Sequence, residues 1–308
     1  MERKQVTYGS KFDLEHRRKF LWASEAPKII GAQQGRYDLW AQKAEGAPAP
    51  DLSGIEAVQM GHVMQRTILG LFNDQTGKSF MHAGDTFEVS SDYEFLAAHT
   101  DGLTTGESAI LEIKNFNQSR RSQFGDWGSA DVPVVVEAQC IHEAIAFGVE
   151  HVYVAVLFGG QEFVAYKLTP SDHERTVYSD RAAAFWESIQ SKTPPEPLDS
   201  EEVLALWPRD SGDTVPADSR LSGVVHDLKL VREKLKKLEI EEKLLSEDIK
   251  LALRGASALV DSAGKPLVTW KASADGFAFD PKAFQQDHPN LYKKYTMSRP
   301  GSRRFLVK

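Results

Sequence analysis

Apolar residues recur at roughly helical intervals through the first quarter of the chain. Residues 12–32 and 35–50 carry this spacing, and residues 53–77 carry apolar side chains largely on one side. The spacing predicts three helical segments. The last is expected to end at Gly77, because glycine takes the left-handed backbone conformation that follows many helices.

The pattern then changes to the short apolar runs that are typical of strands. Residues 86–91, 95–103 and 109–116 predict strands, and the last two predict an antiparallel pair joined by a turn of about five residues. Residues 116–133 are polar and rich in glycine, which predicts a loop.

Helix and strand patterns alternate again after this loop. They predict a helix over residues 134–148, a hairpin over residues 151–168, and a helix over residues 171–190 that Ser171 caps. This order of elements predicts an α/β or α+β core with a helical extension.

The last third of the chain has a different character. Residues 199–220 are rich in Pro, Ser and Asp and predict a linker after a first domain of residues 1–198. Residues 221–254 predict a long amphipathic, coiled-coil-like helix, because apolar residues fill two heptad positions, with a break at Glu242. Residues 255–308 predict a small basic module with a hairpin, a short helix and a last strand.

Composition narrows the class of protein. The chain has 308 residues, of which 41% are hydrophobic, enough for a sizeable buried core. Its single cysteine, Cys140, excludes an intrachain disulfide and a thiolate zinc site. No apolar run approaches the ~20 residues of a membrane helix, and the first residues lack an apolar signal core. We therefore expect a cytoplasmic protein without a membrane partner.

The net charge of −7 is unevenly distributed. Residues 221–308 hold 17 Lys and Arg against 11 Asp and Glu, a balance of +6, whereas residues 1–220 carry −13. An acidic first part does not attract a polyanion through its whole surface. Contact with nucleic acid would need local basic groups, bound metal or the basic C-terminal part. An ordinary solvated surface with uneven charge gives the same pattern.

Three charged residues come together in the predicted hairpin. Asp101 ends one strand beside a glycine, and Glu112 and Lys114 share one face of the next strand, because side chains alternate along a strand. Two neighbouring carboxylates repel each other when both are ionised, and a divalent cation removes that penalty. Oxygen ligands favour Mg²⁺ or Mn²⁺ over zinc. A plain salt bridge between Glu112 and Lys114 is the alternative explanation.

These residues and their surroundings resemble the PD-(D/E)XK nuclease fold. The resemblance implies an α/β (α+β), restriction-endonuclease-like core in which a central mixed sheet is flanked by helices. More narrowly, the chain resembles the YqaJ-type viral recombinase family, which includes lambda-type phage exonucleases. The order and spacing of the matching stretches cover about residues 10–190; they are "LWASEAPKIIGA", "DLWAQKAEG", "GHVMQ", "HTDGL", "LEIK", "EAQCIHEAIAFG" and "YVAVLFGGQEFVAYKL".

The resemblance implies a role for each matching residue. Asp101 and Glu112 are expected to bind Mg²⁺ or Mn²⁺ together with the backbone carbonyl of Ile113. Lys114 is expected to be the catalytic lysine, and Gln139 a catalytic glutamine near the lysine and the attacking water.

Gln65 departs from the family pattern. Members usually carry glutamate at this place in the first helix, in a "GHxxE" motif. An amide oxygen can also bind a hard cation, but it adds no negative charge, so metal affinity should fall. Three explanations stay open: a single tightly held metal, a subfamily that uses glutamine, or an inactivating change. Neighbouring Glu56 is a further candidate ligand.

Basic and aromatic residues in three places are candidates for DNA contact, through phosphates or base stacking. In relatives that degrade DNA from its ends, an early Arg and Ser bind the terminal phosphate. The candidates are Arg17, Arg18 and Ser24 near the start, Arg120, Arg121 and Trp127 after the hairpin, and Lys293, Lys294, Arg303 and Arg304 in the tail. Solvated surface charge is the alternative at each place.

His142 is a further candidate because it lies three residues after Gln139 on the same predicted helix. Helical spacing puts the two side chains on neighbouring positions of one face. The sequence therefore leaves open that His142 approaches the site.

The resemblance implies a Mg-dependent deoxyribonuclease that hydrolyses phosphodiesters with a metal-activated water. The implied activity is an end-dependent 5′-to-3′ exonuclease on linear duplex DNA. Phage-type recombination in a host cytoplasm is the implied setting, with a single-strand annealing protein as partner and a homo-oligomeric enzyme. The alternatives are a catalytically impaired nuclease-fold DNA-binding or assembly protein, an endonuclease on structured DNA, and an interaction protein whose heptads bind a partner helix.

Overall fold

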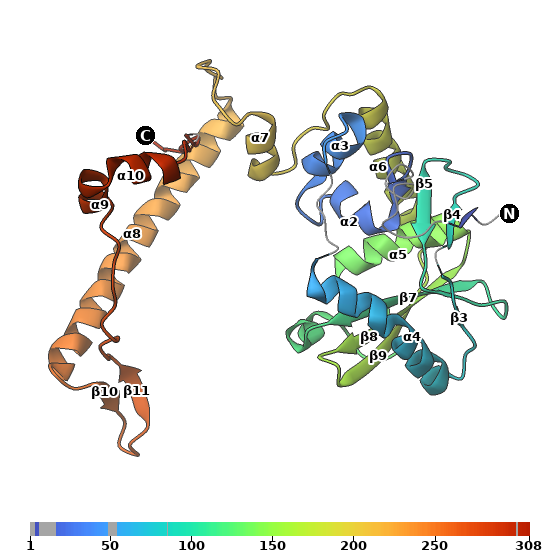
Figure 1. Ribbon diagram of the computed structural model, residues 1–308, viewed down its shortest axis with the longest axis horizontal. Helices are drawn as coiled ribbons and strands as arrows, with labels where there is room; N and C mark the ends of the chain where they lie inside the picture. Colours follow the sequence, from blue (N-terminus) through green and yellow to red (C-terminus); the bar gives the residue numbers. More distant parts are fainter. Residues whose placement is uncertain (1–3, 6–16, 49–53, 85, 300) are drawn as a thin grey trace. The chain divides into compact units, whose positions relative to one another are not determined.

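The computed structural model describes residues 4–5, 17–48, 54–84, 86–299 and 301–308. The chain forms two compact units, residues 1–207 and residues 208–308, which are coloured from blue to yellow and from yellow to red in Figure 1. Within the described ranges, no helix combines the length and the apolar character of a membrane-crossing segment.

A five-stranded mixed sheet is the centre of the first unit. The strand order is β3-β6-β7-β8-β9, and only β7 and β8 run parallel. The bounds are β3 Met81–His82, β6 Gly102–Leu103, β7 Ala109–Phe116, β8 His151–Phe158 and β9 Glu162–Leu168. The predicted hairpin over residues 151–168 turns at Gly159 and Gly160, both of which have positive φ angles. The predicted mixed sheet is confirmed.

One helix covers each face of this sheet. Helix α4, Glu56–Thr76, packs Ile68 and Phe72 against Leu111 of β7, whereas helix α5, Val134–Phe147, packs Cys140 against Ile110. Side chains alternate along β7, so the even-numbered positions 110, 112 and 114 face α5. This alternation directs Glu112 and Lys114 toward the helix that carries Gln139.

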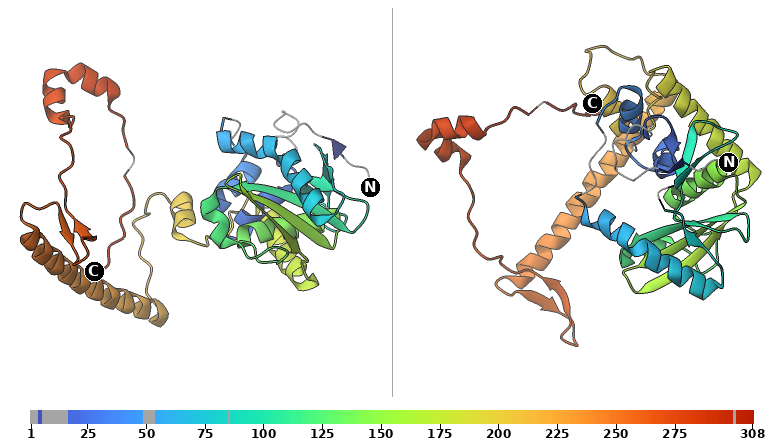
Figure 2. Two further views of the ribbon diagram at one scale, coloured as in Figure 1. Left: turned by 90° about the horizontal axis from the view of Figure 1, so that it is seen from below. Right: turned by 45° about the vertical axis from the view of Figure 1, so that its right-hand side comes forward.

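A second layer covers the other side of α5, which lies between this layer and the large sheet (Figures 1 and 2). It contains a four-stranded sheet of order β1-β4-β5-β2, in which β2 and β5 are parallel. Helices and a 3₁₀ turn complete it. The bounds are β1 Lys4–Gln5, β2 Leu21–Trp22, η1 Ala23–Glu25, α2 Ala26–Ile29, α3 Arg36–Ala44, β4 Thr86–Val89, β5 Leu96–His99 and α6 Asp172–Gln190. Ser171 caps α6 in a capping box, as predicted.

Two predictions about local structure were wrong. Residues 12–32 are no single helix. Residues 12–16 lie outside the described residues, and in the described part Leu21 and Trp22 form a strand beside β5 that separates helical Arg17 from the helix Ala26–Ile29. The predicted strand over residues 95–103 is divided between β5 in the small sheet and β6 in the large one. The chain crosses between the sheets at Thr100 and Asp101, because Thr100 Oγ1 and the Asp101 N–H both donate to the Leu111 carbonyl.

The predicted linker also contains a helix that belongs to the first unit. Helix α7, Ser200–Leu206, carries Glu202, which is buried and forms a salt bridge of 3.0 Å with Arg36. The Arg36 guanidinium also donates to the backbone carbonyl of Glu196. These contacts hold residues 196–207 on the first unit, which therefore extends beyond the predicted boundary at residue 198 to residue 207.

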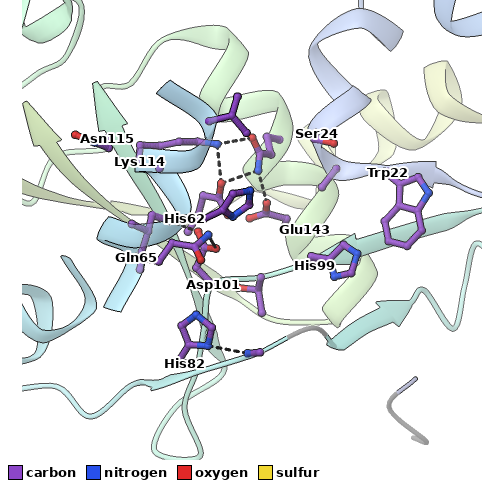
Figure 3. A pocket seen from close by; sticks show the side chains of 18 of the residues that line it. Trp22, Ser24, His62, Gln65, His82, His99, Asp101, Lys114, Asn115 and Glu143 are labelled. Carbon is purple, nitrogen blue, oxygen red and sulfur yellow. Dashed lines mark hydrogen bonds and ion pairs between the residues drawn. The ribbon is translucent and has the colours of Figure 1, made fainter. Parts of the chain in front are cut away.

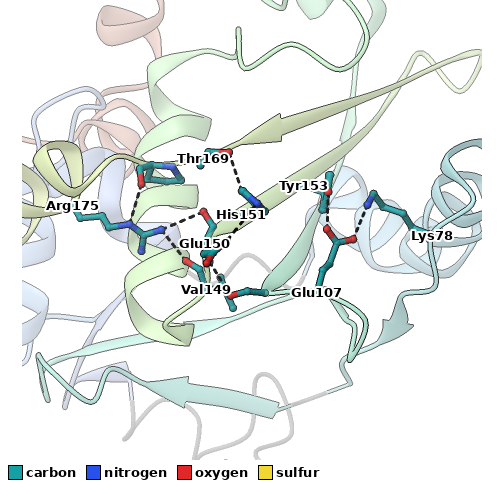
Figure 4. Close-up of polar contacts among 10 residues, drawn as sticks. Lys78, Glu107, Val149, Glu150, His151, Tyr153, Thr169 and Arg175 are labelled. Atoms are coloured by element: carbon teal, nitrogen blue, oxygen red, sulfur yellow. Dashed lines mark hydrogen bonds and ion pairs between the residues drawn. The ribbon is translucent and has the colours of Figure 1, made fainter.

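A polar cluster ties the turn between β6 and β7 to the sheet (Figure 4). Glu107 in this turn accepts a hydrogen bond from Tyr153 and pairs with Lys78 at 2.6 Å, next to the end of α4. The bonds from Lys78 and Tyr153 outweigh partial burial and lower the pKa of Glu107 below its ordinary value. The anchored turn fixes the register of the strand that carries Glu112 and Lys114.

The second unit is built from elements with little mutual burial. It contains the long predicted helix, the predicted hairpin and two short helices, but the described residues 301–308 form no last strand. The bounds in the second unit are α8 Ser219–Leu253, β10 Ala258–Val260, β11 Pro266–Thr269, α9 Pro281–Asp287 and α10 Pro289–Tyr295. In the first unit, the 3₁₀ turn η2, Gln118–Gln123, takes up part of the predicted loop.

Candidate active site

Asp101 lies at the point where the chain crosses from one sheet to the other. Its Oδ2 accepts a hydrogen bond of 2.7 Å from the Ile113 N–H, and its Oδ1 accepts one of 2.7 Å from Gln65 Nε2. The next residue must be small, because a Cβ on Gly102 would lie 3.0 Å from the Cβ of Leu111. Gly102 therefore lets β6 pack closely on β7, which brings Asp101 against the strand that carries Glu112.

Glu112 and Lys114 face α5 from neighbouring positions of β7. Lys114 Nζ lies 2.6 Å from Glu112 Oε1, and Glu112 is only 6% exposed. The salt bridge that the sequence allowed is thus present. It is one contact in a larger buried network, so it does not by itself explain the two residues.

Gln139 on α5 joins these residues. Its Oε1 accepts a hydrogen bond of 2.8 Å from Lys114 Nζ, and its Nε2 donates to Glu112 Oε1 at 2.7 Å. The amide also donates to Glu143 Oε1 at 2.7 Å. Gln139 therefore holds the lysine and both carboxylates in one arrangement, next to the lysine as the sequence predicted.

Glu143 is the member of the network that the sequence analysis missed. It is fully buried one helical turn after Gln139, and its Oε2 has no hydrogen-bond partner among the described residues. The available signal was the four-residue spacing from Gln139, which puts both side chains on one face of the helix. Figure 3 shows Glu143 turned toward Lys114 and the cleft.

The network contains more negative than positive charge. Burial and the charge of Glu112 raise the pKa of Asp101 well above its ordinary value, although the Ile113 N–H and Lys114 oppose this shift. Burial and the charge of Glu112 also raise the pKa of Glu143. Burial alone would lower the pKa of Lys114, but Glu112, Glu143 and Asp101 raise it above its ordinary value. Lys114 therefore stays an ammonium ion.

This network lies at the base of a cleft of about 560 Å³ (Figure 3). Asp101, Glu112, Lys114, Gln139, Glu143 and Gln65 all line it. Trp22 stacks on His99 on one wall, with ring centroids 4.9 Å apart. His62 and His82 also line the cleft, and sequence reasoning assigned neither of them to the site.

Of the three predicted DNA-contacting residues near the N-terminus, two line the cleft and one does not. Arg17 and Ser24 line the cleft, and the Arg17 guanidinium lies 5.8 Å from the centroid of the Trp22 ring. Arg18 is exposed away from the cleft lining and donates to the Gly46 carbonyl.

The other predicted DNA-contacting residues do not line the cleft. Arg121 is held by Glu162 at 2.6 Å and donates to two backbone carbonyls, so its guanidinium has a structural role. Arg120 is exposed over Phe116, and Trp127 is 47% exposed. The four tail residues are exposed in the second unit; they are Lys293, Lys294, Arg303 and Arg304.

His142 does not approach the site. It is fully buried on the other side of α5, where Nδ1 lies 2.6 Å from the Tyr178 hydroxyl and Nε2 lies 3.0 Å from the Ala97 carbonyl. Burial lowers its pKa to about 3. His142 is therefore a neutral core residue whose ring links Tyr178 of α6 to Ala97 of β5.

The donor set of the cleft fits a hard divalent cation. Among the described residues, no three His, Cys, Asp or Glu side chains are arranged as a metal site on their own. The predicted ligands, however, also include an amide and a backbone carbonyl. Asp101, Glu112 and Glu143 share one positive side chain, Lys114, and burial together with the charge of Glu112 raises the pKa of Asp101 and of Glu143. A cation beside Asp101 and Glu112 would supply further positive charge there.

Comparison with known proteins adds a full-length relative. No protein-family model matches the sequence. YqaJ of Bacillus subtilis (strain 168), an uncharacterized protein, is 24% identical over 305 residues, which cover 96% of this chain and 93% of YqaJ. The chain is thus similar to YqaJ along nearly all of its length. The resemblance that the motifs predicted is thereby confirmed, and in YqaJ it extends beyond the first unit.

Two solved structures align with this chain at low sequence identity. The alkaline exonuclease LHK-Exo of Laribacter hongkongensis is 12% identical with a TM-score of 0.48, over 60% of this chain and 94% of that chain. A phage related exonuclease of Haemophilus somnus 129PT is 10% identical with a TM-score of 0.45, over 58% and 97%.

Proposed function

We propose that the chain is a metal-dependent DNA nuclease, and that it acts as a 5′-to-3′ exonuclease on linear duplex DNA in phage-type recombination. The observation that carries this proposal is the buried network of Asp101, Glu112, Lys114 and Gln139 at the base of a cleft. The similarity to YqaJ over 96% of the chain, together with the motifs that resemble the YqaJ-type family, supports it further.

Each residue of the network has a task in this reaction. Asp101 and Glu112 would hold the cation, Mg²⁺ or Mn²⁺, together with the Ile113 carbonyl. When bound, the cation supplies the positive charge that activates water and neutralises the scissile phosphate. The Lys114 pKa is raised, so this side chain donates hydrogen bonds to the water or phosphate and does not remove a proton. Gln139 keeps the Lys114 ammonium group directed into the cleft.

The test compares linear 5′-phosphorylated duplex with closed circular duplex in Mg²⁺, Mn²⁺ or EDTA. We expect metal-dependent loss of the linear duplex only, and loss of this activity in Lys114→Ala. Lys167→Ala is the matched control, because Lys167 is a half-buried lysine on β9 of the same sheet outside the cleft lining. Cleavage of the closed circular duplex would instead identify an endonuclease.

A catalytically impaired DNA-binding protein is the second candidate, and Gln65 favours it. Gln65 Nε2 donates to Asp101 Oδ1, so a neutral amide occupies the place where the family usually has a carboxylate. The same assay separates the two candidates. Duplex binding without cleavage by the natural chain, with cleavage by Gln65→Glu, would identify a site inactivated at this one residue.

A further inference from the structure

The second unit has almost no core of its own. Among the described residues of 208–308, Leu253 is the single buried one. The main element is α8, whose 35 residues correspond to about 52 Å of helix. A unit of this size normally buries a large fraction of its apolar surface. The exposed apolar side chains of α8 therefore indicate a surface that another chain covers.

The exposed apolar residues of α8 follow a heptad repeat. Nine of the ten positions a and d are apolar, and the tenth is Glu242. Position a holds Leu221, Leu228, Leu235, Glu242 and Ile249, and position d holds Val224, Val231, Leu238, Leu245 and Ala252. Six of these side chains are between 38% and 59% exposed; they are Leu221, Val224, Val231, Leu235, Leu238 and Leu245. A repeat sustained over five heptads is the pattern of a coiled-coil seam.

We propose that α8 of one chain pairs with α8 of a second copy in a parallel, in-register, two-stranded coiled coil. The argument for a second copy is charge complementarity at the flanking positions g and e. In a parallel pair, position g of one helix meets position e of the next heptad of its partner. Asp227 then meets Arg232, and Lys234 meets Glu239. Each pair forms twice, so the coil gains four attractive contacts and no like-charged g–e contact.

An antiparallel pair of the same helices is less complementary. It aligns position a of one helix with position d of the other and brings positions g opposite each other, and likewise positions e. With full overlap of the seam, Lys234 meets Glu241 and Arg232 meets Glu239, but Asp227 meets Asp248, which is a like-charged contact that the parallel pair lacks. The charge pattern therefore favours the parallel arrangement.

Glu242 interrupts the seam and limits its stability. In the parallel pair, Glu242 of both copies occupy the same layer, where two carboxylates repel each other. A polar residue at a single position a fixes register at the expense of affinity. We expect Glu242→Leu to tighten association.

The helix supplies a closely matched pair of variants for the test. Leu244 and Leu245 are adjacent and both 59% exposed, but Leu245 lies at position d in the seam and Leu244 at position c outside it. We expect Leu245→Asp to raise the dissociation constant of the full-length dimer by at least about 100-fold, since each dimer carries the change twice. Sedimentation equilibrium measures this constant, and Leu244→Asp should leave it within about threefold. Equal effects of the two changes, or no effect of either, would overturn the proposal.

A charge exchange tests the orientation without altering net charge. Asp227→Lys with Lys234→Glu creates four like-charged contacts in the parallel pair, so this g-exchanged chain should be largely monomeric. Arg232→Glu with Glu239→Lys should do the same at position e. A mixture of the two chains should restore dimers, because every g–e contact is again attractive. The control exchange, Glu233→Lys with Lys236→Glu, lies at outward positions f and b and should not alter the mass.

Each outcome of the mixing experiment has a clear meaning. Heterodimers from two monomeric variants support the parallel coil. Dimers that persist in the g-exchanged chain alone would contradict the parallel arrangement, and a trimer mass for the natural chain would contradict the two-stranded one. Metal-dependent cleavage, if present, belongs to the first unit, so the sedimentation results stand independently of the proposed function.

Discussion

The two units treat charged and apolar residues in opposite ways. In the first unit, Glu112 and Glu143 are buried in the core around one lysine, and apolar side chains from two sheets and several helices enclose them. In the second unit, the leucines and valines of α8 are exposed, and Leu253 alone is buried among the described residues. The first unit thus buries charged side chains, which is energetically unfavourable, and the second unit leaves apolar side chains exposed to solvent.

This difference indicates how each unit obtains its function. Buried carboxylates without enough positive charge destabilise a fold, so their presence points to a cation that binds there. Exposed apolar residues in a heptad repeat point to a second helix that covers them. In both units, an energetically unfavourable feature, buried carboxylates in one and exposed apolar side chains in the other, indicates the kind of binding partner that would relieve it. The proposed cation would neutralise the buried carboxylates of the first unit, and the proposed second copy would cover the apolar seam of the second.

The largest expected effect concerns the buried charges. Asp101→Asn should lower metal-dependent cleavage by about 10³-fold, because it removes a proposed ligand charge from a water-excluded site. It should also abolish the rise in melting temperature that Mg²⁺ or Mn²⁺ gives the natural chain, a rise that mass action requires of any ligand of the folded state. Differential scanning calorimetry with and without EDTA measures it. Asp92→Asn, in an exposed turn, is the control; an unchanged metal response in Asp101→Asn would remove Asp101 from the site.

Separating the units should produce two kinds of unfolding. Residues 1–207 hold the buried clusters, so this fragment should melt within a few degrees of the full chain and independently of concentration. Residues 208–308 should lose helical circular dichroism on dilution, because their apolar surface is buried only by association. Helicity of the second fragment that does not depend on concentration would contradict the contrast between the units.

A smaller effect is expected at Gln65. Gln65→Glu restores a carboxylate beside Asp101 and should raise metal affinity and cleavage by about tenfold, equivalent to about 1.4 kcal/mol. Metal titration followed by calorimetry or by activity measures the change. Gln59→Glu adds the same charge to the same helix outside the cleft lining and should have little effect. An effect of equal size in both variants would indicate a general electrostatic influence of the charge and not a ligand.

The sequence predicted the local parts of the molecule better than the junctions between them. Alternation along residues 109–116 correctly placed Glu112 and Lys114 on one face, and helical periodicity found α4, α5 and α6. The crossing between sheets at Asp101 could not be predicted, because it depends on hydrogen bonds to Leu111 from a strand that the sequence shows as continuous. The buried pair of Arg36 and Glu202 was missed for the same reason, since 166 residues separate its partners.

The smallest expected effect concerns Glu143. Burial and Glu112 raise its folded-state pKa above the ordinary value of 4.5, so the folded state holds this proton more tightly than the unfolded state does. The stability from this group is present below pH 4.5 and is lost as pH rises through the folded-state value. Each proton released contributes a slope of up to about 1.4 kcal/mol per pH unit to the free energy of unfolding. Urea unfolding in EDTA between pH 5 and 9 measures this slope.

Glu143→Gln keeps the hydrogen bond to Gln139 and removes the titrating group, so it should flatten the decline of stability above pH 5. Asp101, whose pKa is also raised, retains its own part of the decline in both proteins. Glu187→Gln on the exposed side of α6 should leave the natural slope unchanged. A slope that is the same in Glu143→Gln and the natural chain would mean that Glu143 is already ionised in the folded state. The first unit would then carry a third negative charge beside Lys114, and its need for a bound cation would be greater still.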